Sequence, residues 1–334
     1  MRKPKIIELC LTLLFLTAAA GADAPAPAPA PAGPPPLRIA AVQLRLTEAM
    51  LSSFAAFEER IAALTAAAAV HEPDLIVFPE YTGVFLALVP YASAWGDDED
   101  LTVETAFAAI RRREGLAGSL KELFLLNSGL AERALGEIFG GLARRWEVPV
   151  LAGSYFACEV KPDGRAELRN RAVLFGPEGQ RLYSQDKVFL TDFESALLGL
   201  EPGRREEARP FVLAGRSLGL TVCRDTYDRG WEEHFRDLDL WIDIKANGVA
   251  FDQQERQSFQ RALPARIAAS GVPLGLTVCL TGEFLELFWE GESSLVRREA
   301  EGVRYVWRAA DPKAEEIALL LLEPAAAFER AAAE

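Results

Sequence analysis

Apolar runs alternate with amphipathic stretches from the start of the foldable part of the chain. Residues 37–44 (Leu-Arg-Ile-Ala-Ala-Val-Gln-Leu) and residues 74–78 form short apolar runs typical of strands. Between them, apolar residues recur every three or four positions from Thr47 to Val70. This period predicts an amphipathic helix with Thr47 as its N-cap.

The middle of the chain is expected to be helical and then to turn to strands. Residues 85–147 have a mostly helical pattern, interrupted by an acidic loop at 97–100. A strand is expected at 148–156. Residues 170–188 read as a β-hairpin around the turn sequence Gly176-Pro177-Glu178-Gly179.

The last third of the chain mixes strands with two helices. Helices are expected at 231–238 and 253–270, with a helix or loose tail at 325–334. Further strands are expected at 211–213, 218–222, 240–244, 272–279, 294–298, 303–307 and 317–322. Strands that alternate with helices early and pair as hairpins later predict sheets covered by helices on their outer faces.

Composition and charge limit the classes of partner. The chain has 334 residues, 50% of them hydrophobic, which suffices for one large α/β core. Its formal net charge of −13 repels nucleic acid and anionic membrane surfaces. We therefore expect neither as a partner.

The N-terminus has the pattern of a secretory signal. Residues 1–22 combine a basic start, an apolar stretch from Leu9 to Ala20 and small residues suited to cleavage. An uncleaved N-terminal anchor is the alternative. Residues 23–36 are rich in Ala and Pro and form an extended linker, so the folded domain is expected at 37–334. We expect a secreted or periplasmic protein without a membrane span once the signal is removed.

Cysteine and histidine counts restrict the chemistry. Removal of the signal leaves Cys158, Cys223 and Cys279, an odd number that implies at least one free thiol. The sequence does not decide whether Cys158 and Cys279 pair. The two histidines, His71 and His234, form no cluster with metal-ligand spacing, so neither a metal nor another cofactor is expected.

Cys223 stands where an apolar strand gives way to a polar turn. Backbone N–H groups of such a turn can lower the pKa of a thiol and hold an oxyanion, which makes Cys223 a candidate nucleophile. A buried structural cysteine is the alternative. Neither histidine ends a strand, so a Cys–His pair is not favoured.

Two acids and a lysine complete the candidate chemistry. Glu80 follows an apolar strand through Pro79, a place where partial desolvation suits a carboxylate to proton transfer. Lys187 ends another predicted strand and would stabilise a thiolate or an oxyanion. Glu194 could hold that lysine or orient the base.

Three segments in this order resemble the carbon–nitrogen hydrolase (nitrilase) superfamily. They are Phe78-Pro79-Glu80-Tyr81, Asp186-Lys187-Val188-Phe189-Leu190-Thr191-Asp192-Phe193-Glu194 and Leu220-Thr221-Val222-Cys223-Arg224-Asp225. The similarity extends from Arg38 to about Leu322. It implies an α/β fold built as a four-layer αββα sandwich, and hydrolysis of non-peptide C–N bonds.

The resemblance also assigns roles to the residues. Cys223 would attack an amide or nitrile carbon after losing its proton to Glu80. Lys187 and the backbone N–H of Arg224 would hold the developing negative charge, and Glu194 would position substrate and lysine. Family members commonly pair, so a homo-oligomer is implied.

The chain departs from the family pattern around the motifs. Phe189 replaces the usual histidine after the lysine, and Cys279 stands where asparagine is common. Tyr81, Asp225 and Trp231 are candidates to line the pocket, with packing as the alternative for each.

Three readings of function remain open. The first is a cysteine-dependent amidase acting on a small amide, nitrile or carbamoyl compound. The second is an acyltransferase that passes the same thioester to an amine. The third is a binding protein that keeps the fold without turnover.

Overall fold

A computed structural model gives the arrangement of residues 35–94, 101–116 and 118–323. The predicted signal peptide, the linker up to residue 34, the acidic loop at 97–100 and the tail at 325–334 lie outside the described residues. The predictions made for those segments therefore stay predictions.

The first of two large sheets contains the N-terminal strands, and the last strand of the chain forms one of its edges. Its strand order is β15-β1-β3-β4-β5-β6, with β1, β3 and β4 parallel. The antiparallel pair β5 and β6 confirms the predicted hairpin. The strands are β1 (Leu37–Gln43), β3 (Leu75–Val77), β4 (Val150–Val160), β5 (Ala166–Phe175), β6 (Arg181–Asp186) and β15 (Glu316–Leu322).

The second sheet repeats this plan with a parallel centre. Its order is β14-β13-β10-β9-β8-β7, with β8, β9 and β10 parallel. The strands are β7 (Phe211–Leu213), β8 (Arg216–Val222), β9 (Leu240–Lys245), β10 (Leu274–Cys279), β13 (Ser294–Glu299) and β14 (Gly302–Arg308). Ligand sites in such sheets gather at the carboxyl ends of parallel strands.

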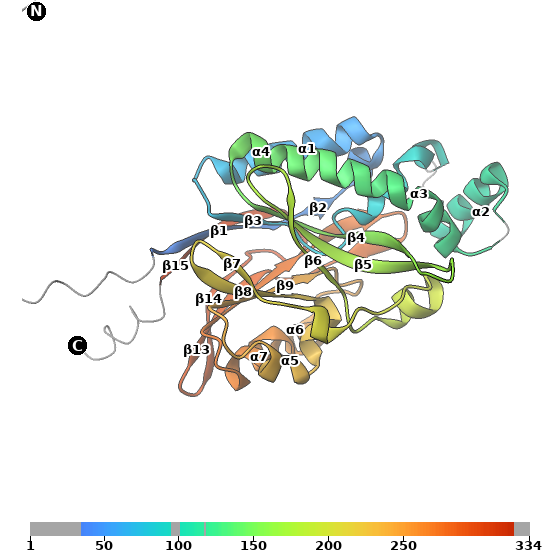
Figure 1. Cartoon of the computed structure of the whole chain (residues 1–334). Coiled ribbons are helices and arrows are strands. Elements are labelled where there is room, and N and C mark those ends of the chain that lie inside the picture. Colours follow the sequence, from blue (N-terminus) through green and yellow to red (C-terminus); the bar gives the residue numbers. More distant parts are fainter. Residues whose placement is uncertain (1–34, 95–100, 117, 324–334) are drawn as a thin grey trace, which may run out of the picture. The chain divides into compact units, whose positions relative to one another are not determined.

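Helices cover the outer face of each sheet (Figure 1). On the first sheet they are α1 (Phe54–Ala69), α3 (Leu120–Leu135) and α4 (Gly141–Trp146). On the second they are α5 (Gly230–His234), α6 (Gln253–Arg261) and α7 (Leu263–Ala269). α2 (Val103–Glu114) lies beyond α3 at one end of the first layer.

Shorter turns link these elements. The π segment η4 (Gly136–Gly140) joins α3 to α4 without a break, and a second π segment is η5 (Phe193–Leu197). The 3-10 turns are η1 (Glu48–Leu51), η2 (Val84–Ala87), η3 (Val89–Ala94), η6 (Arg205–Glu207) and η7 (Cys223–Tyr227).

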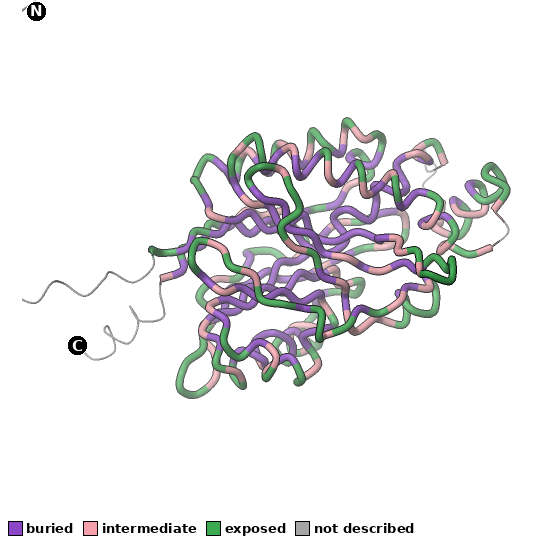
Figure 2. Tube along the Cα trace, viewed as in Figure 1, coloured by how far each residue is buried: buried purple, intermediate pink, exposed green. Residues whose placement is uncertain are grey.

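The alternation of side chains along the strands produces the layers. In β1, Ile39 and Ala41 pack between the two sheets, whereas Ala40 and Val42 pack against the helices. Residues of β8, β9 and β10 fill the same space between the sheets from the other side. Figure 2 shows the strands as the buried interior and the outer sides of the helices as exposed. The predicted four-layer αββα sandwich is confirmed.

Two local predictions were wrong. The first long helix begins at Phe54, and its N-cap is Ser53, whose side chain accepts from the backbone N–H of Ala56. Thr47 caps only the short turn η1, without a side-chain hydrogen bond. The helix expected at 253–270 breaks at Ala262, because Pro264 lacks an N–H and its ring crowds the preceding turn.

A small three-stranded sheet was not predicted. It contains β2 (Arg45–Leu46), β11 (Thr281–Phe284) and β12 (Leu287–Trp289). β2 has only two residues, too few for a period-two pattern to stand out. Within residues 35–94, 101–116 and 118–323, no helix has both the length and the apolar character of a membrane span.

Candidate active site

Lys187 lies between two buried carboxylates. Its Nζ is 2.8 Å from Glu80 Oε1 and 2.8 Å from Glu194 Oε2, and all three side chains are at most 1% exposed. Glu80 lies in the loop after β3, Lys187 directly follows β6 and Glu194 lies in η5. The fold therefore brings together the two acids and the lysine that the sequence singled out.

The loop after β3 fixes Glu80. Tyr81, the next residue, has a positive φ of 66°, a strained conformation for a side chain of its size. Its backbone N–H donates to Ser154 Oγ over 2.9 Å. Glu80 Oε2 accepts from the backbone N–H of Ala246 over 2.7 Å, and Glu80 Oε1 accepts from Asn170 Nδ2 over 2.9 Å. The Glu80 carboxylate is thus held at both oxygens.

Glu194 is equally constrained. Its Oε1 accepts from the Tyr81 hydroxyl and from Asn170 Nδ2, each over 2.9 Å. Its Oε2 accepts from the backbone N–H of Thr191 over 2.9 Å. Burial alone would raise the pKa of Glu194, but Lys187 and these donors outweigh it and hold the pKa below its usual value. Glu194 therefore remains an anion that anchors Lys187.

The net pKa shift of Glu80 has the opposite sign to that of Glu194. Removal from water raises the pKa of Glu80, and the charge of Glu194 adds to that rise, while Lys187 opposes it. Lys187 itself keeps a raised pKa, because attraction to Glu80, Cys223 and Glu194 overcomes its own desolvation. A carboxyl with a raised pKa beside a permanent cation suits a group that takes up and returns a proton.

Cys223 stands at the carboxyl end of β8, as the first residue of η7. Its φ is +53°, in the left-handed region that non-glycine residues seldom occupy. The strained turn places Cys223 in the lining of a cavity of about 430 Å³. Strain of this kind is held by the surrounding structure, and it gathers at functional sites.

The expectation of a lowered thiol pKa is wrong for this resting structure. Burial, followed by the charge of Glu80, raises the pKa of Cys223 to about 12, although Lys187 and Lys245 oppose the shift. The thiol is therefore protonated at neutral pH. A base must remove the proton as the sulfur attacks, which gives Glu80 its importance.

The cavity has the size of small-molecule sites, which measure roughly 300–1,000 Å³. It is lined by Thr191, Cys223, Arg224, Tyr227, Lys245, Asn247, Ser258 and Phe259. The backbone N–H of Arg224, which the family resemblance assigns to the oxyanion, follows Cys223 directly. That assignment stays a prediction.

The three residues proposed as pocket lining do not line this cavity. Tyr81 is buried, and its hydroxyl donates to Glu194. Asp225 is buried and accepts from the backbone N–H groups of Val188, Phe189 and Val222, so it ties the lysine loop to the cysteine turn. Trp231 packs in the core between the second sheet and its helices. Packing or positioning explains all three.

Sequence reasoning missed three polar residues at the site. Asn170 donates to both Glu80 and Glu194. In the sequence it was only the first residue of a predicted strand, with no sign of a role at the site. Asp243 and Lys245 form a buried ion pair of 3.0 Å on β9. Their signal was a pair of opposite charges two residues apart in an otherwise apolar strand, and so on the same face.

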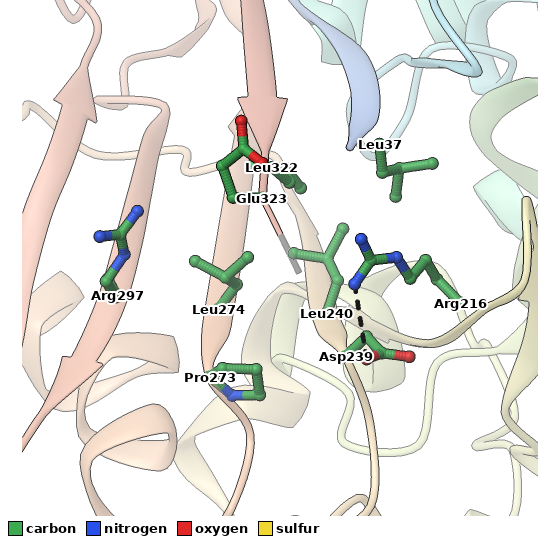
Figure 3. Close-up of a pocket in the computed structure, with 9 residues that line it drawn as sticks. All are labelled: Leu37, Arg216, Asp239, Leu240, Pro273, Leu274, Arg297, Leu322 and Glu323. Carbon is green, nitrogen blue, oxygen red and sulfur yellow. Dashed lines mark ion pairs between the residues drawn. The ribbon is translucent and has the colours of Figure 1, made fainter. Parts of the chain in front are cut away.

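A second hollow lies at the opposite end of the sheets (Figure 3). Its lining includes Leu37, Leu240 and Leu274, the first residues of β1, β9 and β10. Its volume of about 20 Å³ holds little more than one water molecule. The cavity at Cys223 is the better candidate for a substrate.

All three cysteines within the described residues, Cys158, Cys223 and Cys279, are free thiols. Cys279 is fully buried, and burial raises its pKa above the usual range. No disulfide between Cys158 and Cys279 is therefore present in this structure. The Cys223 sulfur is not engaged in a crosslink.

The fold matches solved structures of the nitrilase superfamily. Three of them are an amidase from Nesterenkonia sp. (18% identity, TM-score 0.58, 89% of this chain and 97% of that chain), a CN-hydrolase superfamily protein from Xanthomonas campestris (18%, 0.58, 89% and 94%) and Nit3 from Saccharomyces cerevisiae, a member of branch 10 of the superfamily (15%, 0.59, 89% and 94%). No family model and no curated protein matches the sequence. The resemblance seen in the sequence is confirmed at the level of the fold.

Proposed function

We propose that this protein is an exported, cysteine-dependent hydrolase of non-peptide C–N bonds, with amides as its substrates. One observation carries the proposal: Cys223 lines a cavity of about 430 Å³, and the charges of Glu80 and Lys187, two members of the buried cluster with Glu194, act on its thiol. Base, cation and nucleophile are thus together at one site. The shared fold with solved amidases supports the same reaction class.

The first half of the reaction forms a thioester. Glu80 takes the proton of Cys223 as the sulfur attacks the amide carbon, and the carbonyl oxygen becomes an oxyanion. Lys187 and the backbone N–H of Arg224 hold this charge. Glu80 then passes the proton to the nitrogen, the C–N bond breaks and ammonia or an amine leaves.

The second half of the reaction hydrolyses the thioester and regenerates the free enzyme. Glu80 removes a proton from water, and the hydroxyl attacks the thioester carbon to form a second oxyanion at the same donors. The C–S bond breaks, a carboxylic acid is released and Cys223 regains its proton. The net reaction is amide plus water to acid plus amine.

Replacing the nucleophile tests the proposal. Cys223→Ala should abolish ammonia release from a panel of primary amides, nitriles and carbamoyl compounds, while the circular dichroism spectrum stays that of the wild type. Cys158→Ala, a change at a partly buried thiol on β4, is the matched control and should keep full activity. Turnover by Cys223→Ala, or a wild type inactive on the whole panel, would refute the proposal.

The products separate hydrolysis from the two other readings. An added amine acceptor that captures most of the acyl group would identify an acyltransferase. Mass spectrometry of the intact wild type with each candidate should show an acyl adduct that Cys223→Ala lacks. Saturable substrate binding without any adduct or product would identify a binding protein instead.

Export and assembly are part of the proposal and rest on separate tests. The basic start and apolar stretch within residues 1–22 support a secretory signal. Mass spectrometry of the protein recovered outside the cytoplasm should show a mature chain that starts near residue 23. Light scattering should show a homo-oligomer, as implied by the resemblance to a family whose members commonly pair.

A further inference from the structure

A second buried ion pair lies directly behind the cysteine turn. Asp243 and Lys245 share the outer face of β9, and Lys245 Nζ is 3.0 Å from Asp243 Oδ2. Both side chains are at most 2% exposed. Taking such a pair out of water is costly, so its presence in an otherwise apolar strand calls for a specific partner.

That partner is the backbone carbonyl of Cys223. Lys245 Nζ donates to this oxygen over 2.8 Å, and the hydroxyl of Thr226 lies 2.9 Å from it. Lys245 Nζ also donates to Thr226 Oγ1 over 3.2 Å, and Thr226 Oγ1 is 3.1 Å from Asp243 Oδ2. The four residues form one closed network around a single carbonyl oxygen.

The three N–H donors of the Lys245 ammonium are matched by Asp243, the Cys223 carbonyl and Thr226. None is left to bind a substrate, although Lys245 lines the cavity. Lys245 therefore acts on the chemistry through the backbone of Cys223.

The geometry points to a role for this network in building the oxyanion site. In a planar trans peptide the C=O and N–H groups face opposite directions. We infer that Lys245 and Asp243 are positioning residues: by holding the Cys223 carbonyl, they aim the N–H of Arg224 at the substrate oxygen. This inference rests on the proposed function only in that the Arg224 N–H is the oxyanion donor.

Two further features fit this role. The residue Cys223 has a φ of +53°, and this strained backbone conformation is kept only when contacts from the surrounding structure stabilise it. A cation on the carbonyl also polarises the same peptide unit, which makes its N–H a stronger donor. The network therefore both orients the donor and strengthens it.

The test is the paired substitution Asp243→Asn with Lys245→Met, which removes both charges together and leaves no buried charge without a partner. The probe is propionaldehyde. The Cys223 sulfur adds to its carbonyl carbon, the thiol proton passes to Glu80, and the aldehyde oxygen becomes an alkoxide at the Arg224 N–H. Affinity is measured as protection of Cys223 from iodoacetamide, whose own displacement reaction forms no oxyanion.

We expect aldehyde affinity and kcat each to fall about 10- to 100-fold in the paired variant, with KM within about twofold. Alkylation of Cys223 by iodoacetamide at pH 9 should change less than about threefold, because the two opposite charges leave together. The control Arg60→Met with Glu315→Gln removes an ion pair between α1 and the segment before β15 and should change none of these values. Unchanged aldehyde affinity in a folded paired variant overturns the inference.

A second variant covers the case in which the paired change prevents folding. Thr226→Val removes one hydroxyl next to the carbonyl without altering charge, and aldehyde affinity should fall about 3- to 10-fold. An unchanged affinity in this variant overturns the inference as well. If the wild type releases no ammonia, the proposed function fails, yet the aldehyde comparison still decides the role of the network.

Discussion

The Lys187 ammonium donates to Glu80 Oε1 over 2.8 Å, and both side chains are 1% exposed. The same ammonium lies 2.8 Å from Glu194 Oε2. One cation thus compensates two carboxylates in a region closed to water. The two buried carboxylates therefore depend on Lys187 for charge compensation. Because the pKa of Glu80 is raised and that of Glu194 is lowered, Glu80 is the acid of the two that can change protonation.

Lys187→Met is expected to cost both stability and activity. The change leaves the Glu80 and Glu194 carboxylates buried without a cation, which typically costs about 3–5 kcal/mol of unfolding free energy. Ammonia release should fall at least about 100-fold, because an oxyanion donor is lost. Urea unfolding and steady-state kinetics measure the two effects. A variant as stable as the wild type would show that the cluster is not held by this charge.

Glu80→Gln separates the base from the rest of the cluster. Glutamine keeps the shape and can still accept from Lys187, but it takes up no proton, so kcat should fall about 100- to 10,000-fold. Glu72→Gln, at an exposed position, is the control and should keep wild-type kinetics. Near wild-type turnover by Glu80→Gln would assign the base to another group.

Much of this fold could be predicted from apolar runs and turn residues. The strand β8 leads into Cys223 and the strand β3 into Pro79 and Glu80, as their hydrophobic pattern indicates. Buried central strands carry this signal strongly because both of their faces exclude water. The resemblance of the segments around Glu80, Lys187 and Cys223 to the carbon–nitrogen hydrolase superfamily then implied the four-layer fold that brings these residues together.

The remaining features depend on contacts between distant segments. In the sequence, Lys245 is only a polar residue at the end of a strand. Its role depends on the carbonyl of Cys223, which lies 22 positions away in sequence. The sequence made Trp231 a candidate for the pocket, whereas in the structure it packs against the second sheet. The direction of the Cys223 pKa shift depends on burial, which no local pattern measures. Tertiary environment, in each case, outweighs local sequence.

The pH dependence of alkylation tests the resting state of Cys223. Burial and Glu80 raise its pKa to about 12, so the thiolate fraction at pH 7 is small and grows tenfold with each pH unit. Iodoacetamide should therefore alkylate Cys223 more slowly at pH 7 than it alkylates the thiol of free glutathione. The rate at Cys223 should then increase progressively up to pH 10. Peptide mass mapping in a Cys158→Ala background isolates the site. A rate that is already maximal at pH 7 would indicate an ionised thiol.

Asp225 gives the fold its own pH dependence. Burial raises the pKa of Asp225 from 3.8 to about 7, although the backbone N–H groups of Phe189, Val222 and Val188 oppose the shift. Between these two values the unfolded chain is ionised while the folded chain holds the proton. The contribution to stability is therefore full below about pH 4 and is lost as the pH rises towards 7, with a limiting slope of about 1.4 kcal/mol per pH unit.

Asp225→Asn removes this titration and keeps the size of the side chain. Urea unfolding at intervals from pH 4 to pH 8 should show that the wild type loses stability relative to the variant as the pH rises. Asp237→Asn, at an exposed position, is the matched control and should follow the wild-type curve. Parallel curves for Asp225→Asn and the wild type would mean that Asp225 is ionised throughout this range. Its contacts with the Val188, Phe189 and Val222 N–H groups would then hold a fixed anion between the lysine loop and the cysteine turn.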